Sequence, residues 1–334
     1  MATSPVRVAV DAMGGDRAPE AIVEGARTAA SAEIVPVLFG RRSVLEPLAG
    51  GLEIVDAEQV VAMDEKPSDA LREKRESSLS RSCRAVHDGT ADVVVGAGNT
   101  GAMLATGLVE IRRLPDVYRP AIALPLPSLG GPSILIDAGA NADARPEHLV
   151  QFAHMGAVFA EEILGLGDPS VALLSIGEEP EKGNKLVREA HDELAAASGL
   201  RFTGNVEGRD LLRKAADVVV CDGFTGNMAL KLLEGTIQAT LQAFRDEVKG
   251  SLRGKLGGLL IRPAARALRT RFDPDTYGGA YLLGLRGLVV IAHGNSSATA
   301  IANAVRYGAR GVTGGVVDCV AERLSTRVRE TATP

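Results

Sequence analysis

Residues 91–105 read ADVVVGAGNTGAMLA, and residues 216–230 repeat the pattern as ADVVVCDGFTGNMAL. In each copy a run of valines precedes a glycine turn that contains Thr-Gly, and a helix-forming segment follows. A continuous β-branched run bounded by glycine predicts a buried strand of a parallel sheet. We call the two turns the first glycine corner (residues 96–101) and the second glycine corner (residues 221–227). The repeated unit predicts an α/β fold built from strand–turn–helix units.

A glycine corner of this kind is suited to binding an anion. A strand that turns sharply into a helix brings free main-chain N–H groups and the positive end of the helix to one spot. Many glycine corners in α/β proteins only make the bend, but Asn99, Thr225 and Asn227 add hydrogen-bonding side chains that a simple bend does not need. We therefore predict that the two corners hold two parts of one charged substrate. The predicted members are Gly98, Asn99, Thr100, Gly101, Gly223, Thr225, Gly226 and Asn227.

The composition is that of a globular protein and excludes several classes. The 334 residues are 46% hydrophobic and 24% charged. A net charge of −5, an aromatic content of 3% and the absence of Trp argue against nucleic-acid binding. Three scattered cysteines without a pairing or metal-ligand pattern indicate a reducing compartment and no metal site. Because we find neither a signal-peptide pattern nor an apolar run long enough to span a membrane, we expect a cytoplasmic protein.

Strand and helix patterns alternate along the chain. Strands are predicted at 6–10, 34–39, 93–95, 121–126, 134–136, 171–176, 218–220 and 288–292. Strands that alternate with helices at this spacing predict a three-layer α/β/α sandwich with a mostly parallel sheet. We expect a single α/β catalytic unit over residues 1–334, formed either as one body or as two lobes around a cleft, with an inserted helical segment at about 246–275.

Further candidate site residues follow the predicted strands, where α/β folds bind their ligands. Asp11 and Asp16 come after the first strand and can bind a substrate hydroxyl or orient a base, but they can equally cap the turn. His293 is the only histidine at a predicted strand-to-helix corner. The candidates from later strand ends and the helix after the second corner are Lys182, Asn184, Arg209, Asp222 and Lys231.

The first glycine corner formally matches G-x-G-x-x-G, the turn of dinucleotide-binding proteins. That interpretation also requires an acidic residue about 20 residues further on, at the end of the next strand. The strand at 121–126 ends in Pro-Leu-Pro instead, so only half of the fingerprint is present. An NAD(P)-dependent dehydrogenase is therefore the weaker alternative, and a non-catalytic membrane-docking module is a third.

The segment 249–272, KGSLRGKLGGLLIRPAARALRTRF, contains seven Lys or Arg residues and no acid. Apolar residues between the basic ones predict two short cationic amphipathic helices with a corner at Pro263. Such a hairpin is suited to an anionic membrane surface or an acidic protein, and a helix pair packed at a subunit contact is the alternative. The residues predicted to make this contact are Arg253, Lys255, Leu259, Leu260, Arg262, Arg266 and Leu268.

Eight stretches in this order resemble the bacterial phosphate acyltransferase (acyl-ACP:phosphate transacylase) family of phospholipid synthesis. They are VDAMGGD (10–16), GNTGA (98–102), DAGAN (137–141), KGN (182–184), GNVEGRDLL (204–212), DVVVCDGFTGN (217–227), YGGA (277–280) and AHGNSS (292–297). Each stretch alone is a weak signal, but their joint order is specific and covers nearly the whole chain. The resemblance implies a fold akin to phosphotransacetylase and the isocitrate dehydrogenase group. It also implies a homodimer.

The activity implied by the resemblance is reversible transfer of a fatty acyl group from acyl carrier protein to inorganic phosphate. The product, an acyl phosphate, would pass to a membrane glycerol-3-phosphate acyltransferase, with the enzyme peripherally associated with the membrane and no cofactor required. We expect Lys182, Arg209 and Lys231 to neutralise phosphate, and His293 or Asp222 to accept or steer its proton. Cys221, at the end of a buried valine run, is expected to be a packing thiol rather than a nucleophile that carries the acyl group.

Overall fold

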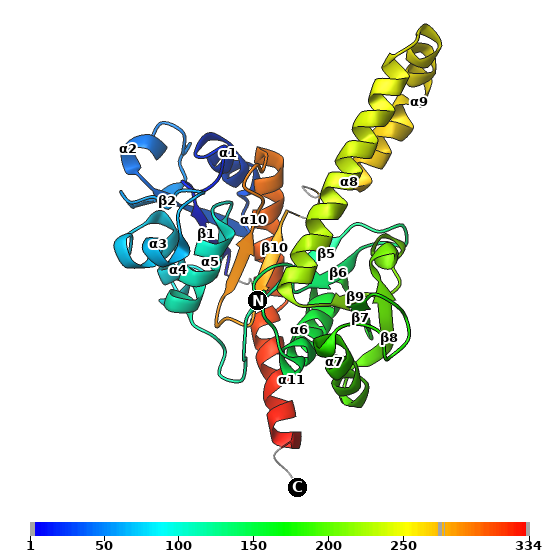
Figure 1. The fold of residues 1–334 in the computed structure, drawn as a ribbon. Helices are drawn as coiled ribbons and strands as arrows, with labels where there is room; N and C mark the ends of the chain where they lie inside the picture. The colour runs from blue at the N-terminus through cyan, green and yellow to red at the C-terminus, as the bar shows by residue number, and fades with distance from the viewer. Residues whose placement is uncertain (1–3, 273–275, 277, 332–334) are drawn as a thin grey trace.

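The computed structural model describes residues 4–272, 276 and 278–331 (Figure 1). Its strands are β1 (Val6–Asp11), β2 (Ile34–Gly40), β3 (Glu53–Asp56), β4 (Val93–Gly96), β5 (Ala121–Leu126), β6 (Ser133–Ile136), β7 (Ser170–Ser175), β8 (Arg201–Glu207), β9 (Val218–Val220), β10 (Ala280–Leu283) and β11 (Leu288–Ile291). In the described part of the chain they form a single sheet in the order β3-β2-β1-β4-β11-β10-β5-β6-β9-β7-β8. The predicted strands are thus confirmed, with β3, β8 and β10 added.

The helices cover both faces of this sheet. They are α1 (Glu20–Ala29), α2 (Arg42–Leu45), α3 (Pro67–Glu73), α4 (Ser78–His87), α5 (Thr100–Thr106), α6 (Pro146–Leu164), α7 (Lys185–Ala196), α8 (Gly223–Lys249), α9 (Leu252–Arg271), α10 (Ala298–Thr313) and α11 (Val316–Thr331). A π-helical turn, η1 (Gly107–Ile111), extends α5, and a 3₁₀ turn, η2 (Gly208–Arg213), follows β8. The predicted three-layer α/β/α architecture is confirmed.

Strand direction changes near the middle of the sheet. The strands β3, β2, β1, β4 and β11 are parallel to one another, as are β6, β9, β7 and β8 at the other end. Between these two blocks, β10 pairs antiparallel with both β11 and β5, and β5 pairs antiparallel with β6. The two parallel blocks therefore run in opposite directions within a sheet that is mostly parallel.

Alternation along each strand divides the core into two layers. Val8 and Val10 of β1 point to one face, where Ile22 of α1 and Ile301 of α10 pack against them. Ala9, between them, belongs to the other face, together with Leu79 of α4 and Cys83. Such strands, buried on both faces, are expected of a parallel sheet covered by helices on each side.

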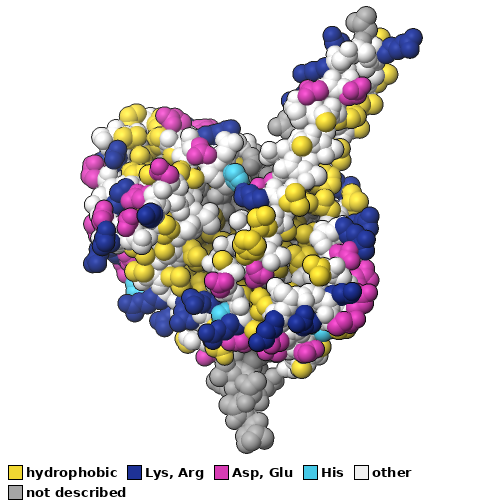
Figure 2. All heavy atoms as spheres, viewed as in Figure 1, with side chains coloured by type: hydrophobic (Ala, Val, Ile, Leu, Met, Phe, Trp, Pro, Cys, Tyr) yellow, Lys and Arg dark blue, Asp and Glu magenta, His cyan; other side chains and the backbone are white. Residues whose placement is uncertain are grey.

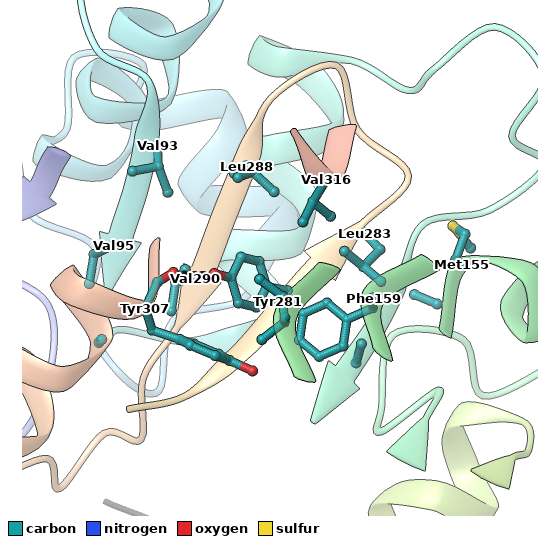
Figure 3. Close-up of a cluster of buried hydrophobic side chains, with 14 of the residues drawn as sticks. Val93, Val95, Met155, Phe159, Tyr281, Leu283, Leu288, Val290, Tyr307 and Val316 are labelled. Atoms are coloured by element: carbon teal, nitrogen blue, oxygen red, sulfur yellow. Dashed lines mark hydrogen bonds between the residues drawn. The ribbon is translucent and has the colours of Figure 1, made fainter. Parts of the chain in front are cut away.

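A cluster of aromatic rings joins the two blocks at the change of direction (Figure 3). Tyr281 of β10 packs edge-on against Phe159 of α6 at 5.0 Å and against Tyr307 of α10 at 4.6 Å between ring centroids. The Tyr281 hydroxyl donates to the main-chain oxygen of Tyr307. Helices from both halves of the chain thus share one core around the middle strand.

The helices α8 and α9 form a hairpin that projects from the body of the protein (Figure 1). The prediction of two short helices with a corner at Pro263 is wrong, because Pro263 lies inside α9 and the chain reverses at Gly250 and Ser251. The Ser251 hydroxyl accepts a hydrogen bond from Gly254 N at 2.9 Å and so caps α9. Proline within a helix removes one N–H donor and causes a local disturbance, but the turns on either side persist here.

Gly258 permits the close approach of the two hairpin helices. A Cβ atom at Gly258 would lie 2.5 Å from Val248 Cγ1 of α8, which is closer than side-chain packing allows. Contact with α8 therefore supports the first turns of α9, on the N-terminal side of Pro263.

Candidate functional site

The first group of predicted site residues lies where β1, β4 and β11 end. Gly14, Gly98 and Gly294 bring three turns together with their main chains in near contact. A Cβ atom at Gly14 would lie 3.0 Å from Gly98 Cα, and one at Gly15 would lie 3.2 Å from Gly294 O. Asp16 N also donates to Gly294 O at 2.8 Å. Glycine is needed here because no side chain fits between these turns.

Asn99 serves as the N-cap of α5. Its Oδ1 accepts from Ala102 N at 3.0 Å, and its Nδ2 donates to the main-chain oxygens of Met63 and Glu65. All of these partners are protein groups, so the Asn99 side chain already has a structural role. The main-chain N–H groups of Thr100 and Gly101 donate to no protein acceptor in the described part of the chain. These two N–H groups can therefore donate to a ligand.

The two acids and the histidine of this group differ in exposure. Asp11 is only 3% exposed, whereas Asp16 and His293 are exposed. Burial raises the pKa of Asp11, although hydrogen bonds from Ser78 and from the amides of Met13 and Gly14 oppose the shift. The ring nitrogen Nδ1 of His293 accepts from Asn295 N at 3.3 Å. We call this set of residues, with the first glycine corner, the first cluster.

The second cluster is organised around Asp137, a residue that the sequence analysis did not select. Its side chain is fully buried between β6 and α8. Oδ1 accepts from the amides of Ile122, Gly139 and Ala140, and Oδ2 accepts from the amide and the side chain of Asn141. Five donors satisfy a buried carboxylate and fix the loop 137–141. The position of Asp137 at a strand end, within the stretch DAGAN, was the available signal.

Asp222 caps α8 at the second glycine corner. Its Oδ1 accepts from Thr225 N at 2.9 Å, and its Oδ2 accepts from the Thr225 hydroxyl at 2.7 Å. Gly223 N donates to Asn141 O at 2.7 Å, so the corner is bonded directly to the loop that Asp137 fixes. The expectation that this corner offers a set of free amides is therefore wrong for Gly223, Thr225 and Gly226, whose N–H groups have protein acceptors.

The remaining polar candidates lie near the second cluster, because β6, β7, β8 and β9 run in the same direction. Lys182 is exposed in the loop after β7, and Asn184 caps α7 by accepting from Val187 N at 2.9 Å. Arg209 forms an ion pair with Glu207 at 2.7 Å. Lys231 forms one with Glu234 at 3.0 Å on the exposed side of α8. Asn227 is exposed and lies against Gly139.

The first and second clusters are separate groups in this structure. The strands β4 and β9 run in opposite directions, so the two glycine corners leave the sheet from opposite edges. Within residues 4–272, 276 and 278–331, no hydrogen bond or ion pair connects them. The sequence predicted each group but not this separation.

A cleft of about 650 Å³ adjoins the second cluster. It is lined by Leu108, Arg113, Tyr118, Arg119, Pro120, Asp143, Ala144, Arg145 and His148. Asn141 Nδ2 donates to Pro120 O at 2.8 Å and so joins the wall of the cleft to the loop of the second cluster. We call this the basic cleft. Sequence reasoning missed it, because its arginines come from two segments that carry no motif.

The residues predicted for membrane or carrier-protein contact all lie on α9 and are all exposed. Leu259 is 65% exposed, Leu260 is 82% exposed and Leu268 is 48% exposed. Arg253, Lys255, Arg262 and Arg266 are exposed on the same helix. Figure 2 shows hydrophobic and basic side chains next to one another on the projecting hairpin. Among the helices described, none has the length and the apolar character that crossing a membrane requires.

Comparison with known proteins places the chain in a family. Its backbone resembles a phosphotransacetylase from Streptococcus pyogenes, with a TM-score of 0.63 over 92% of this chain and 94% of that one at 18% identity, which identifies the fold. The family described as fatty acid synthesis protein matches residues 6–318.

Curated relatives are more specific. The phosphate acyltransferase of Heliobacterium modesticaldum is 46% identical over 332 residues, covering 97% of this chain and 99% of the relative. That of Thermobifida fusca is 49% identical over 325 residues, covering 94% and 90%. The fold is thus that of the phosphotransacetylases, and the chain is an enzyme, an acyltransferase of lipid biosynthesis. It belongs to the phosphate acyltransferase family. This membership excludes the alternative that the chain is an NAD(P)-dependent dehydrogenase.

Proposed function

We propose that this enzyme transfers a fatty acyl group from the thioester of acyl carrier protein to inorganic phosphate, forming acyl phosphate for phospholipid synthesis. A phosphate oxygen attacks the thioester carbonyl carbon, the C–S bond breaks, and the thiol leaves with a proton. Because a thioester is already activated and phosphate is a competent nucleophile, the reaction needs no covalent acyl-enzyme. The observation that carries the proposal is the second cluster, where the capped start of α8 and the Thr225 hydroxyl are bonded to the loop that Asp137 fixes after β6.

The second cluster would position the phosphate and stabilise the transition state. Thr225 and Asn227 present polar side chains at the start of α8, where the helix dipole favours a negative charge. Thr225 would act by holding Asp222 in place. The exposed side-chain amide of Asn227 would be the donor aimed at a developing oxyanion, and one such donor contributes about 3 kcal/mol. Lys182, Arg209 and Lys231 would balance the charge of phosphate, and Asp222 would steer its proton. In the first cluster, His293 is the alternative base, and the amides of Thr100 and Gly101 would hold another part of the substrate.

The test incubates the purified protein with acyl carrier protein loaded with a fatty acid and with inorganic phosphate. Hydroxylamine then traps acyl phosphate as a hydroxamate. We expect phosphate-dependent hydroxamate. We also expect Thr225→Ala to lower kcat/KM by about 100-fold, because it removes the hydroxyl that holds Asp222 for its role in the transition state. Thr313→Ala, which removes a hydroxyl at the end of α10, is the matched control. Hydroxamate that does not depend on phosphate would contradict the proposal.

We further propose that the α8–α9 hairpin brings the enzyme to an anionic membrane, where acyl phosphate can pass to a glycerol-3-phosphate acyltransferase. Basic residues near such a surface each contribute roughly 1 kcal/mol, and exposed leucines add apolar burial. Co-sedimentation with vesicles that contain anionic lipid would measure the association. Arg262→Gln with Arg266→Gln should weaken it and reduce its salt dependence, and Leu259→Ser with Leu260→Ser should weaken it at every salt concentration. Arg72→Gln is the control, and equal binding by all forms would exclude the membrane role.

The homodimer is a separate proposal supported by the base of α8. Phe224, Met228 and Leu232 follow one another at four-residue spacing and are 63%, 57% and 73% exposed. An apolar helix face of this kind is typical of a protein contact. Sedimentation velocity should give a dimer for the unmodified protein and a monomer for Leu232→Asp. Lys231→Asp, at a polar position beside it, should remain a dimer. A monomeric unmodified protein would exclude the proposal.

A further inference from the structure

The basic cleft has the charge and the size of a site for an organic phosphate. Arg113, Arg119 and Arg145 line it together with one acid, Asp143. Glu147, 3.8 Å from Arg145, balances part of this charge. The lining still carries an excess of positive charge. Arginine is the side chain best suited to phosphate, because its planar guanidinium donates two parallel hydrogen bonds.

One arginine side chain of the cleft, that of Arg113, is held by the surrounding main chain, and the main chain of Arg145 is fixed at the start of α6. One terminal nitrogen of Arg113 donates to the main-chain oxygens of Val117 and Tyr118, each at 2.6 Å. Arg145 N donates to His148 Nδ1 at 3.2 Å, so the neutral His148 ring carries its proton on Nε2. The same ring packs against Tyr118, with 6.1 Å between centroids.

Arg119, Arg145 and His148 line the same cleft. Burial lowers the pKa of His148, and the positive charges of Arg119 and Arg145 lower it further, against the opposing effect of Glu147. The shared neighbourhood of the two arginines in the cleft is a property of the fold, because Arg119 precedes β5 and Arg145 caps α6.

The volume of the cleft distinguishes an organic phosphate from the free ion. About 650 Å³ falls within the range of pockets that bind whole small molecules, whereas inorganic phosphate would occupy a small part of it. Leu108, Tyr118 and Pro120 add apolar wall. A ligand that carries a phosphate on an apolar, amide-containing arm fits this lining better than a bare anion does.

The cleft opens beside the second cluster. Asn141 connects the two sites, since its side chain donates to Pro120 O and its main-chain oxygen accepts from Gly223 N at the start of α8. A ligand phosphate in the cleft would thus lie one loop away from the second glycine corner. An extended arm running from the cleft would place its far end at that corner.

We propose that the basic cleft binds the phosphate of the phosphopantetheine arm whose thiol carries the acyl group. The inference rests on the function proposed above and adds the place where the donor is held. Arg119 and Arg145 bind the phosphate, Arg113 is fixed in the wall beside them, and the pantetheine chain runs to the second cluster.

The test compares S-decanoyl-4′-phosphopantetheine with S-decanoyl-pantetheine, which lacks the phosphate, as donors in the hydroxamate assay. The unmodified enzyme should prefer the phosphorylated donor in kcat/KM. Arg119→Ala and Arg145→Ala should each lower kcat/KM for that donor about tenfold, as expected for a lost charge-assisted hydrogen bond, and leave pantetheine unchanged. Lysine at either position should restore part of the loss, and Arg72→Ala, a distant exposed arginine, should match the unmodified enzyme. Because the side chains of Arg119 and Arg145 are exposed, the variants at these two positions should keep the melting temperature of the unmodified protein.

The outcomes separate this inference from the proposed function. An unmodified enzyme that forms no acyl phosphate from acyl carrier protein would refute the proposed function itself. If it is active but the arginine variants affect both small donors equally, or neither, the cleft does not bind the arm phosphate. Loss with acyl carrier protein alone would instead show that the arginines contact the acidic carrier surface, and a raised KM for inorganic phosphate would make the cleft the acceptor site. Each of these last results overturns the inference.

Discussion

Two buried carboxyl groups at strand ends are stabilised to very different degrees. Asp137 accepts five hydrogen bonds from protein donors, which replace the water it has lost. Asp11 is buried with fewer donors, and burial raises its pKa above the ordinary value of 3.8. A carboxyl group in this state costs stability once it is ionised. The first cluster therefore contains a group that destabilises the fold at neutral pH, which is a common property of sites that bind ligands.

Asp11→Asn should reveal this cost as a pH dependence. A raised folded-state pKa means that the folded protein binds the proton more tightly than the unfolded chain does, so the stabilisation is complete below the unfolded pKa and is lost as pH rises through the folded pKa. The free energy of unfolding of the unmodified protein, relative to Asp11→Asn, should therefore fall as the pH rises above the ordinary carboxyl value of 3.8. Urea unfolding at several pH values measures it. Asp88→Asn, at an exposed helix end, should show no such trend, and a relative stability that rises with pH would contradict the assignment.

Cys221 should prove dispensable for the chemistry. The thiol is 2% exposed, and burial raises its pKa well above the ordinary value, so the thiolate that a nucleophile needs is not available. Its Sγ lies 3.6 Å from Asp137 O, so its neighbour is the main chain of the fixed loop. Cys221→Ser should keep kcat within about twofold in the hydroxamate assay. Loss of activity with an unchanged melting temperature, or an acyl group found on Cys221 by mass spectrometry, would establish a covalent route.

For single residues, the sequence predicts where a polar side chain lies but not whether it binds the main chain or a ligand. Asp222 and Asn99 were predicted as site residues because polar side chains follow strands, and both are found there as helix caps that use their oxygens on main-chain amides. The same sequence pattern fits a helix cap and a ligand-binding residue, and only the three-dimensional structure distinguishes the two roles. Arg119 and Arg145 show the opposite limit, because a cleft made by two distant loops leaves no local pattern.

At the scale of elements, strands were predicted well and the hairpin less well. Buried valine runs are distinctive, whereas Pro263 suggested a corner that the structure does not contain. Proline is a strong local signal, but α9 continues through it. The strands β3 (EIVD) and β8 (RFTGNVE) were missed because polar or charged residues interrupt their apolar runs. The strand β10 (AYLL) was missed because it contains no β-branched residue.

Pro263→Ala should strengthen α9. The substitution restores one N–H donor and removes the clash of the ring with the preceding turn, a gain of up to about 3 kcal/mol locally. Hydrogen exchange followed by mass spectrometry should give slower exchange of α9 amides near position 263. Ala265→Gly, two residues away, should have the opposite effect of about 1 kcal/mol. Faster exchange in Pro263→Ala would mean that the proline shapes a bend on which the hairpin depends.

At the scale of the whole molecule, the direction of the strands decides how the two glycine corners can cooperate. The similar sequences of the two glycine corners suggested that both corners bind one substrate at the same place. The pairings around β10 and β5 place them on opposite edges of the sheet instead, and such antiparallel pairings in the middle of a sheet cannot be inferred from short apolar strands. Two parts of one substrate can still be held, provided that each corner acts on its own part.

A double-mutant cycle tests this arrangement. Residues without shared contacts give effects that add within about 0.5 kcal/mol, whereas residues in one hydrogen-bond network do not. His293→Ala and Thr225→Ala should therefore lower log kcat/KM additively, because no hydrogen bond joins the clusters in the part of the chain described. The pair Asp222→Ala and Thr225→Ala, bonded at 2.7 Å, should instead show strong coupling. Coupling above about 1 kcal/mol between His293 and Thr225 would mean that both clusters act on the same substrate atoms.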